Sequence, residues 1–246
     1  TTVGVGGKSI AMDGTYSQKA DWLPKIATGD MIVSFCLTEP DSGSDAGSLR
    51  TRATRDGDDF IIEGTKRFIS NAPLAGLFIV MARTDPSTSG GRGVSAFLVP
   101  ADTPGIEVGP PLKKMGHKGA LVADVTFDAC RVPASAILGG VEGQGFRTPM
   151  KVLDDGRLHI AAVALGLGRR LLEEAVRYAK DRKQFGQAIS DFQLIQAMLA
   201  DSETDLIAAD AMIAATAAKR DAGERVSREA AATKYFATEA TWRIAD

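Results

Sequence analysis

The pattern of apolar residues changes period once along the chain, near Gly145, and this change most constrains the fold. From Met31 to about Val132, short apolar runs alternate with polar residues and are separated by turn-forming residues, which is typical of β-strands. After Gly145, apolar residues recur every three or four positions, which predicts α-helices. Strands and helices do not alternate, which disfavours a Rossmann sheet. We therefore expect an α+β multi-domain fold, a β-barrel or sandwich followed by an α-helical bundle.

Three segments follow from this pattern. Residues 1–30 are expected to be the tail of an N-terminal helical domain, with a short helix over Tyr16–Ala27 that Pro24 makes irregular. Residues 31–140 are expected to form the all-β domain, and residues 141–246 a truncated helical bundle. The chain opens at a threonine and stops within a helical pattern, so we expect a piece of a longer protein.

The β segment contains several expected strands with turns between them. Asp56–Asp59 is an acidic turn that joins two of them into a hairpin, and it lacks the ligand pattern of a calcium loop. The expected strands are Met31–Leu37, Leu49–Arg55, Phe60–Ile62, Lys66–Ser70, Leu77–Arg83, Val94–Val99 and Ala123–Phe127.

Three apolar stripes are expected to form the core of the helical segment. They are Ile160, Val163, Leu167, Leu171, Ala175 and Tyr178; Ile195, Leu199, Ser202, Leu206, Ala209 and Ile213; and Ala231, Tyr235, Thr238 and Trp242. Ser190 and Gln193 have the spacing of a capping box before the second helix, and Ser227 is an expected N-cap of the third.

Composition excludes several classes of function. A formal net charge of −2 gives no basic field, which argues against nucleic-acid binding. The most apolar stretch, Leu158–Gly168, is shorter than the ~20 residues that a membrane-spanning helix needs. Cys36 and Cys130 are isolated, which is typical of reduced structural thiols, and the two histidines are far apart, so no metal site is expected. The glycines near the start, Gly4–Ser9, lack the spacing of a phosphate-binding loop.

Four short strings could carry chemistry. Leu37–Asp45 follows a strand and has the composition of a loop whose N–H groups and hydroxyls suit a polar cofactor, although a surface turn is the alternative. Phe68–Asn71 ends a strand and is weak by itself. Asp181–Gly186 could be only a basic last helical turn closed by a C′ glycine. Leu153–Arg157 opens a helix, where acidic residues already interact with the helix dipole.

Taken together, these strings resemble the acyl-CoA dehydrogenase family. Thr38-Glu39-Pro40 with Gly43-Ser44-Asp45 is similar to the flavin-contacting loop of that family, and Arg182-x-Gln184-Phe185-Gly186 with Gln193 is similar to its FAD-contacting helix end. The resemblance covers most of the chain from about Gly14 onward. It implies FAD-dependent α,β-dehydrogenation of an acyl-CoA thioester in fatty acid (lipid) metabolism, by a protein of which this chain lacks the N-terminal helical part and the C-terminal end.

The resemblance also implies roles for individual residues. FAD contacts would come from Phe35, Leu37, Thr38, Gly43, Ser44, Phe68 and Ser70, and from Arg182, Gln184, Phe185, Ile189, Phe192, Gln193 and Ile195. The family usually has Trp and Thr where this chain has Phe68 and Ser70. The second group would contact an FAD held mainly by a neighbouring subunit, which implies a homo-oligomer, a dimer or a homotetramer. Substrate contacts would come from Ser44, Asp154 and Arg157.

The catalytic base of the family is a glutamate, and residues 1–246 contain no convincing candidate for it. One family position lies immediately before the arginine that matches Arg157, and here it is Gly156. The other lies beyond Asp246, so the visible chain is expected to be incomplete as a catalyst. Gly119-Ala120-Leu121 also lacks the small hydroxyl residue that relatives often carry there.

Several alternatives stay open. An acyl-CoA oxidase or a nitroalkane oxidase shares the fold, and the electron acceptor could be an electron-transfer flavoprotein or oxygen. A base-less flavoprotein that acts as a binding module is a second class, and a scaffold without flavin is a third. The expected compartment is the bacterial cytoplasm, or the mitochondrial matrix in a eukaryote.

Overall fold

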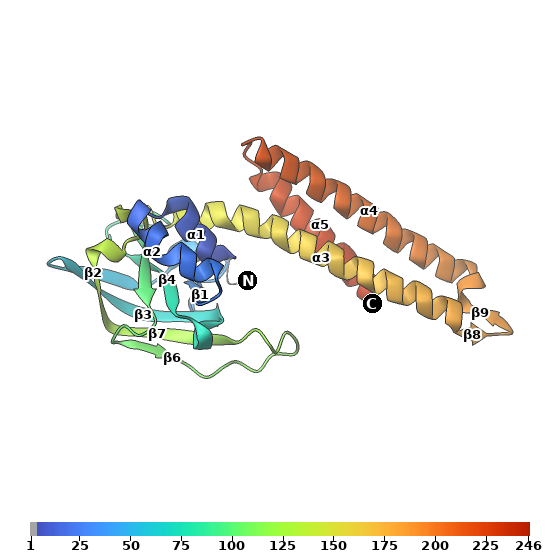
Figure 1. Ribbon diagram of the computed structural model, residues 1–246, viewed down its shortest axis with the longest axis horizontal. Helices are drawn as coiled ribbons and strands as arrows, with labels where there is room; N and C mark the ends of the chain where they lie inside the picture. Colours follow the sequence, from blue (N-terminus) through green and yellow to red (C-terminus); the bar gives the residue numbers. More distant parts are fainter. Residues whose placement is uncertain (1–3) are drawn as a thin grey trace. The chain divides into compact units, whose positions relative to one another are not determined.

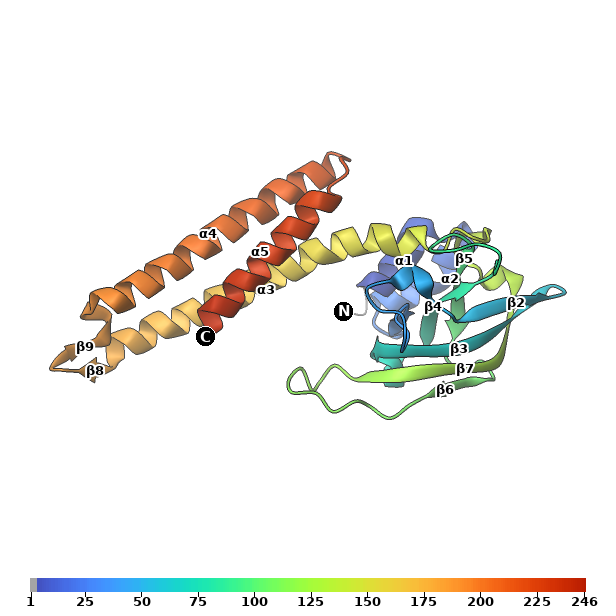
Figure 2. The same cartoon turned by 180° about the vertical axis from the view of Figure 1, so that it is seen from behind.

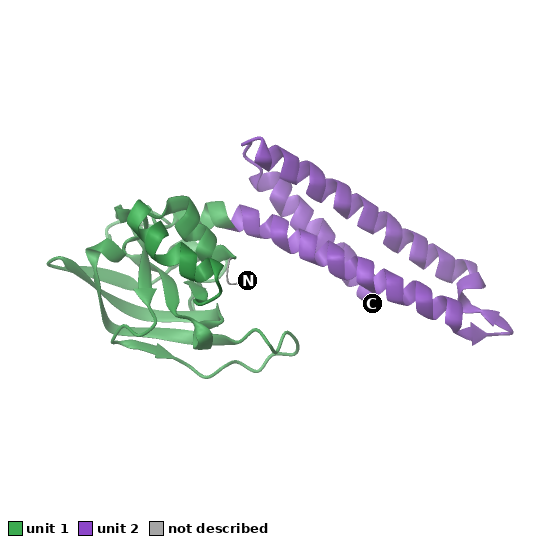
Figure 3. Cartoon of the chain, viewed as in Figure 1, with its two compact units in different colours: residues 1–152 green, residues 153–246 purple. Residues whose placement is uncertain are grey.

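A computed structural model describes residues 4–246 and divides the chain into two compact units, residues 1–152 and 153–246 (Figure 3). The first unit begins with helices α1 (Val5–Asp13) and α2 (Tyr16–Ala27). The expected helix over Tyr16–Ala27 is confirmed, with Pro24 inside it. Most of the Gly4–Ser9 string lies within α1, so it is not a phosphate-binding loop.

Helix α2 is anchored by a capping box at its N-terminus. Thr15 Oγ1 accepts from the backbone N–H of Gln18 (3.2 Å), and Gln18 Oε1 accepts from the N–H of Thr15 (3.0 Å). Gln18 Nε2 also donates to the carbonyls of Ser135 (3.1 Å) and Ile137 (2.7 Å). One glutamine therefore caps the helix and ties it to the end of the β segment.

Thr15→Ala is expected to lower the free energy of unfolding by about 1 kcal/mol, because an N-terminal N–H of α2 loses its acceptor. The midpoint of urea denaturation measures this loss. Ser17→Ala, on the exposed side of the same helical turn, is the control and should change the midpoint little. Equal midpoints for the wild type and Thr15→Ala would contradict the role of the cap.

The first unit is built on one seven-stranded mixed sheet that curls into a half-barrel (Figures 1 and 2). The strands are β1 (Val33–Cys36), β2 (Arg52–Asp56), β3 (Asp59–Ser70), β4 (Leu77–Arg83), β5 (Val94–Pro100), β6 (Ile106–Val108) and β7 (Val122–Pro133). Their order is β1-β4-β2-β3-β7-β6, with β5 also beside β4. β1 and β2 run parallel to β4, and the other pairs are antiparallel. The expected fold class, a β domain followed by helices, is confirmed.

The expected hairpin is also confirmed, since Asp56 and Asp59 are register partners at the end of β2 and β3. Both carboxylates form ion pairs with Arg131, and all three side chains are exposed or half-exposed. The acidic turn therefore lies on the surface. One expected boundary was wrong, because β7 continues six residues past Phe127, and the short strand β6 was not predicted. The second half of β7 loses strict alternation where Ala129 has a φ of 49°, so the sequence pattern breaks there although the pairing with β3 continues.

Both faces of the curled sheet are covered by apolar side chains. Along β4, Phe78, Val80 and Ala82 point into one core. Leu77, Ile79 and Met81 point into the other core, which also contains Ile10 of α1 and Ile26 of α2. The two cysteines are buried in the first core and unpaired, as expected of structural thiols, and burial raises the pKa of Cys36 to about 12.

The second unit is formed by three long helices and a small hairpin. Most of α3 (Arg147–Asp181) belongs to it, followed by β8 (Lys183–Gln184), β9 (Gln187–Ala188), α4 (Gln193–Asp221) and α5 (Ser227–Ala245). The expected stripe on α4 is confirmed, because Leu206 and Ala209 are buried and Leu199 and Ile213 pack beside them. Within residues 4–246, no helix is both long and apolar enough to cross a membrane.

The expected core stripes on α3 and α5 were wrong. Ile160, Val163, Leu167 and Tyr178 of α3 are 50–66% exposed, and Tyr235 and Trp242 of α5 are 68% and 72% exposed. The buried faces instead combine small residues with two leucines, namely Ala161, Ala164, Leu165, Leu172 and Ala179 on α3 and Ala230, Thr233, Ala237, Ala240 and Thr241 on α5. Both helices are apolar on two faces, and spacing alone does not tell which face packs inside one chain.

Neither expected serine cap is formed. Ser190 lies in a short 3₁₀ turn, and α4 begins after Phe192 without a side-chain cap. Ser227 is the first residue of α5, and its hydroxyl donates to Asp154 on α3. The hydroxyl of Ser227 therefore joins two helices instead of capping its own.

Candidate functional site

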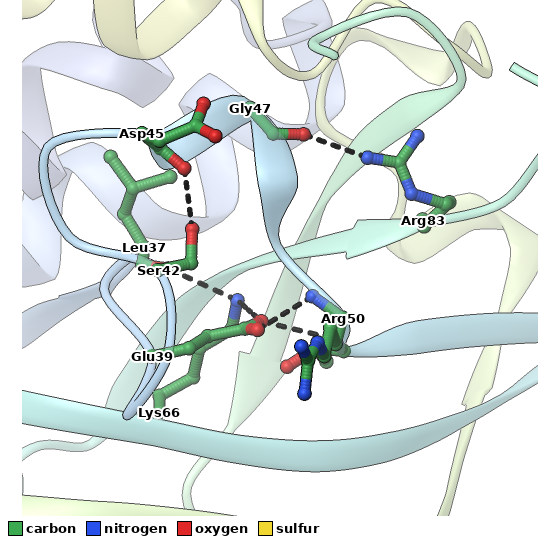
Figure 4. A network of polar contacts seen from close by, with 9 residues as sticks. Leu37, Glu39, Ser42, Asp45, Gly47, Arg50, Lys66 and Arg83 are labelled. Carbon is green, nitrogen blue, oxygen red and sulfur yellow. Dashed lines mark hydrogen bonds and ion pairs between the residues drawn. The ribbon is translucent and has the colours of Figure 1, made fainter. Parts of the chain in front are cut away.

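The loop that follows β1 closes on itself in a tight turn. The backbone N–H of Glu39 donates to Ser42 O (2.9 Å), and the N–H of Ser42 donates to Glu39 O (3.2 Å). The Ser42 hydroxyl donates to Asp45 O (2.7 Å), as Figure 4 shows. Gly43 and Ser44 are exposed on this turn, and a Cβ added at Gly43 would meet no atom within 4 Å. The turn is held by three hydrogen bonds of its own, with open space beside its glycine.

Two hydrogen bonds tie β1 and its loop to the second half of β3. The backbone N–H of Arg67 donates to Thr38 O (2.8 Å), and the Ser34 hydroxyl donates to Ser70 O (2.7 Å). Thr38 therefore lies beside the strand that carries Phe68 and Ser70, although 30 residues separate Thr38 and Phe68 in the sequence. Of the predicted residues of the β unit, the structure thus brings together Thr38, Phe68 and Ser70, and their roles stay predictions. Phe35 and Leu37 are partly buried against the second core.

Phe68 has a strained backbone that turns its ring outward. Its φ is 59°, in the left-handed region that aromatic residues avoid, at an irregularity in the pairing of β3 with β7. Its N–H donates to Asp124 Oδ1 (3.2 Å), and the ring is 58% exposed. The Arg67 guanidinium lies 5.1 Å from the ring centre, and its buried Nε forms no hydrogen bond but lies 3.8 Å from Asp124 Oδ2 in an ion pair. An exposed aromatic ring on a strained backbone is a surface that a bound planar ligand would cover.

A buried ion pair lies under the loop. Lys66 Nζ donates to Glu39 Oε1 (2.7 Å) and to Leu37 O (3.2 Å), and the two side chains are 0% and 5% exposed (Figure 4). The carboxylate of Glu39 also accepts from the N–H groups of Arg50 (2.6 Å) and Thr51 (2.9 Å). Burial lowers the pKa of Lys66 despite the adjacent carboxylate. Burial alone would raise the pKa of Glu39, but Lys66 and the N–H of Arg50 outweigh it and hold that pKa below its ordinary value.

This ion pair was not predicted, although the sequence contains a signal for it. Lys66 is in phase with the inward-facing Phe60 and Ile62 of the same strand, and a lysine at an inward position requires a partner.

Arg83, at the end of β4, holds the far side of the loop. Its guanidinium donates to the carbonyls of Gly47 (2.8 Å), Gly90 (3.0 Å) and Arg92 (3.0 Å), and more weakly to that of Thr88 (3.3 Å). Arg83 thus links the turn after Asp45 to the loop between β4 and β5, and Figure 4 shows its bond to Gly47. Lys66 and Arg83 restrain the Leu37–Ser48 segment at both ends.

In the helical unit, the Arg182 string forms a hairpin beyond the end of α3. Phe185 and Gly186 have φ values of 53° and 82° and form the two-residue turn between β8 and β9. Gly186 is therefore not the C′ glycine of α3, which corrects that alternative. The N–H of Ile189 donates to Arg182 O (2.9 Å), and the ring of Phe185, which is 94% exposed, lies 6.2 Å from that of Phe192.

The hairpin gathers most of the second predicted group in one place. Gln193 and Ile195 follow directly in the first turn of α4, and Gln184 is exposed on β8. Among residues 4–246, no side chain forms an ion pair with Arg182. The guanidinium is exposed and available to an anion.

Helix α3 begins at Arg147, so the expectation that Leu153–Arg157 opens a helix was wrong, and the predicted substrate residues of this string lie inside α3. They already have partners within the helical unit. Asp154 accepts from Arg157 and from Ser227, and Asp155 accepts from both Nε and Nη2 of Arg220. Arg157 is 41% exposed at its side chain. A Cβ added at Gly156 would meet no atom within 4 Å, so the space beside this glycine is open. Among the described residues, no cluster of three or more His, Cys, Asp or Glu could hold a metal ion.

Comparison with known proteins identifies the family. Residues 34–130 match the model described as "Acyl-CoA dehydrogenase, middle domain", and residues 143–246 match "Acyl-CoA dehydrogenase, C-terminal domain". The chain belongs to the acyl-CoA dehydrogenase family.

Individual relatives agree with this assignment. A 3-(aryl)acrylate reductase of Clostridium sporogenes is 42% identical over 238 residues, which are 97% of this chain and 63% of the relative. The butyryl-CoA dehydrogenase of Megasphaera elsdenii has a TM-score of 0.94 at 36% identity, over 99% of this chain and 63% of that one. A glutaryl-CoA dehydrogenase of Mycobacterium smegmatis solved in complex with FADH2 has a TM-score of 0.90 at 35% identity, over 96% and 59%. The chain thus spans less than two thirds of the length of these relatives.

Proposed function

We propose that this chain supplies the middle and helical parts of an FAD-dependent enzyme that removes two hydrogens from Cα and Cβ of an acyl-CoA thioester. The observation that carries the proposal is the convergence of Thr38, Phe68 and Ser70 at one edge of the half-barrel, beside an open glycine turn. A solved relative binds FADH2, and the residues present fit a flavin: an exposed aromatic, two hydroxyls and a glycine turn with open space beside it.

Each group at this edge has a task that fits its chemistry. When bound, FAD supplies the acceptor for a hydride. Phe68 would cover the flavin ring and exclude water from it, with Phe35 and Leu37 beside it. The hydroxyls of Thr38 and Ser70 would donate hydrogen bonds to the polar edge of the ring. Gly43 and Ser44 would present the open turn to the pyrophosphate, and Ser44 would also face the thioester arm of the substrate.

The remaining contacts would come from the helical unit. The exposed Arg182 suits the phosphates of an FAD held by a neighbouring subunit, together with Gln184, Phe185, Ile189, Phe192, Gln193 and Ile195. Asp154 and Arg157 would contact the CoA moiety. The proposal assigns proton abstraction to a glutamate outside residues 1–246, since Gly156 stands at the alternative position.

The proposal includes a homo-oligomer, which the exposed apolar faces of α3 and α5 support. Ile160, Val163 and Leu167 on α3 and Trp242 on α5 are at least half exposed in a single chain, as is usual for residues of a subunit interface. An electron-transfer flavoprotein is the proposed electron acceptor. Two buried, unpaired thiols fit a reducing compartment, so we propose the bacterial cytoplasm or the mitochondrial matrix.

The experiment that tests the proposal is FAD titration of the purified protein, followed by absorbance and fluorescence. Arg182→Met is expected to weaken FAD binding about tenfold or more, because a charge-assisted bond to phosphate is worth about 1.5–3 kcal/mol. Lys183→Met, next to it and also exposed, is the control and should change binding little. A colourless protein that takes up no FAD would overturn the proposal. Reduction of the bound flavin by acyl-CoA, followed by reoxidation with oxygen or an electron-transfer flavoprotein, separates a dehydrogenase from an oxidase.

A further inference from the structure

We propose that Lys66 is a positioning residue for the flavin edge, the part of the half-barrel where Thr38, Phe68 and Ser70 lie together. Its buried ammonium fixes the positions of Leu37 and Thr38 relative to Phe68. The inference rests on the proposed function, since the edge it organises is the one assigned to the flavin. It concerns a side chain that is completely buried and therefore does not touch a ligand itself.

The bonds around Lys66 join two short consecutive stretches of chain. Lys66 Nζ donates to Leu37 O (3.2 Å) and Glu39 Oε1 (2.7 Å), and the N–H of the next residue, Arg67, donates to Thr38 O (2.8 Å). Three successive loop residues are thus bonded by two successive residues of β3. Phe68 follows immediately, at the point where the strand leaves regular pairing. Lys66 therefore fixes the position of the loop relative to the strained Phe68, because it bonds the loop to the strand that carries this residue.

Glu39 extends the same restraint to the other end of the loop. Its carboxylate accepts from the N–H groups of Arg50 and Thr51, at the entry to β2. The pair Lys66–Glu39 thus connects β1, β2 and β3 at one buried place (Figure 4). A buried pair of this kind gives little net stability compared with apolar side chains of similar volume, so its value lies in directed bonds. Apolar side chains at positions 39 and 66 would fill the same space, but they would form no hydrogen bond that fixes the position of the Leu37 carbonyl.

The test is the double variant Lys66→Met/Glu39→Gln, which removes both charges and leaves no unpaired ion in the core. The glutamine side chain introduced by Glu39→Gln keeps one amide oxygen, which replaces only one of the two carboxylate oxygens that accept from the N–H groups of Arg50 and Thr51. The melting temperature is therefore expected to fall somewhat, and FAD binding is measured well below it. The bond to Leu37 O is lost. We expect the dissociation constant for FAD to rise about tenfold or more, and the visible absorption bands of the bound flavin to shift, because small displacements of a preorganised site are costly.

The matched control is Arg52→Met/Glu63→Gln. This pair joins β2 and β3 as well, at 3.0 Å, but both side chains are exposed. The control should bind FAD with wild-type affinity and spectrum. A folded Lys66→Met/Glu39→Gln variant that does the same would overturn the positioning role. Failure of the wild type itself to bind FAD would instead overturn the proposed function.

A measurement on the wild type keeps the inference testable if the double variant does not fold. Amide hydrogen exchange is compared with and without FAD. The N–H groups of Arg50, Thr51 and Arg67 should exchange more slowly with FAD, because ligand binding and the Lys66 network stabilise each other. Slower exchange at Phe68 with no change at these three amides would show that the network is independent of the flavin edge, and would overturn the inference.

Discussion

Lys66→Met is expected to lower the free energy of unfolding by about 3–5 kcal/mol, the largest effect of any single substitution proposed for this protein. The variant leaves the Glu39 carboxylate buried without its cation, with only the N–H groups of Arg50 and Thr51 as partners. Chemical denaturation at neutral pH measures the loss. Arg52→Met, which breaks an exposed pair between β2 and β3, should cost less than about 1 kcal/mol. A loss for Lys66→Met as small as that of Arg52→Met would contradict the burial of a charged pair.

The same substitution has a predictable pH dependence. In the wild type, the pKa of Glu39 is held below its ordinary value, so ionised Glu39 stabilises the fold above about pH 4.3, and this contribution is lost as the pH falls through its folded pKa. Without Lys66, burial dominates and the folded pKa of Glu39 rises. Protonation of Glu39 at acidic pH then removes the buried unpaired charge from the Lys66→Met variant. The difference in stability between wild type and Lys66→Met should therefore shrink when denaturation is repeated at acidic pH.

Gly145→Ala is expected to cost about 3 kcal/mol or more, because the new methyl group would meet backbone and not a movable side chain. A Cβ there would lie 2.1 Å from Ala96 N and 2.2 Å from the carbonyl carbon of Ser95, both on β5. The N–H of Gly145 donates to Val94 O (2.8 Å), which holds the segment against that strand. Chemical denaturation followed by circular dichroism measures the loss.

A glycine with free space around it gives the control for this prediction. A Cβ at Gly166, within α3, would meet no atom within 4 Å, so Gly166→Ala should raise stability by up to about 1 kcal/mol through helix propensity. If Gly145→Ala lowers the free energy of unfolding and Gly166→Ala raises it, the loss at Gly145 comes from the close approach of the β5 backbone and not from the replacement of a glycine as such. A Gly145→Ala variant as stable as the wild type would show that β5 moves away at little cost.

Local patterns predicted much of this molecule. The change of period near Gly145, the Asp56–Asp59 hairpin and the strand Leu77–Arg83 all depend on neighbouring residues, and each is found where it was expected. The strings around Thr38 and Arg182 were sufficient to indicate the family, because they are made of residues close together in the sequence. Periodicity did less well on α3, where Ile160 and Val163 suggested a core face that the fold leaves exposed.

What the sequence determined by itself is therefore the order and type of the elements and the residues gathered in each string, since periodicity, turn chemistry and motif spacing are properties of short stretches of chain. Only the tertiary structure decided that Lys66 meets Glu39 across 27 residues, that the N–H of Arg67 meets Thr38, and that Phe68 stands outward at a φ of 59°. These features arise when the curled sheet brings β1 and its loop against β3. Their energies depend on burial and on partners distant in sequence, which no local pattern encodes.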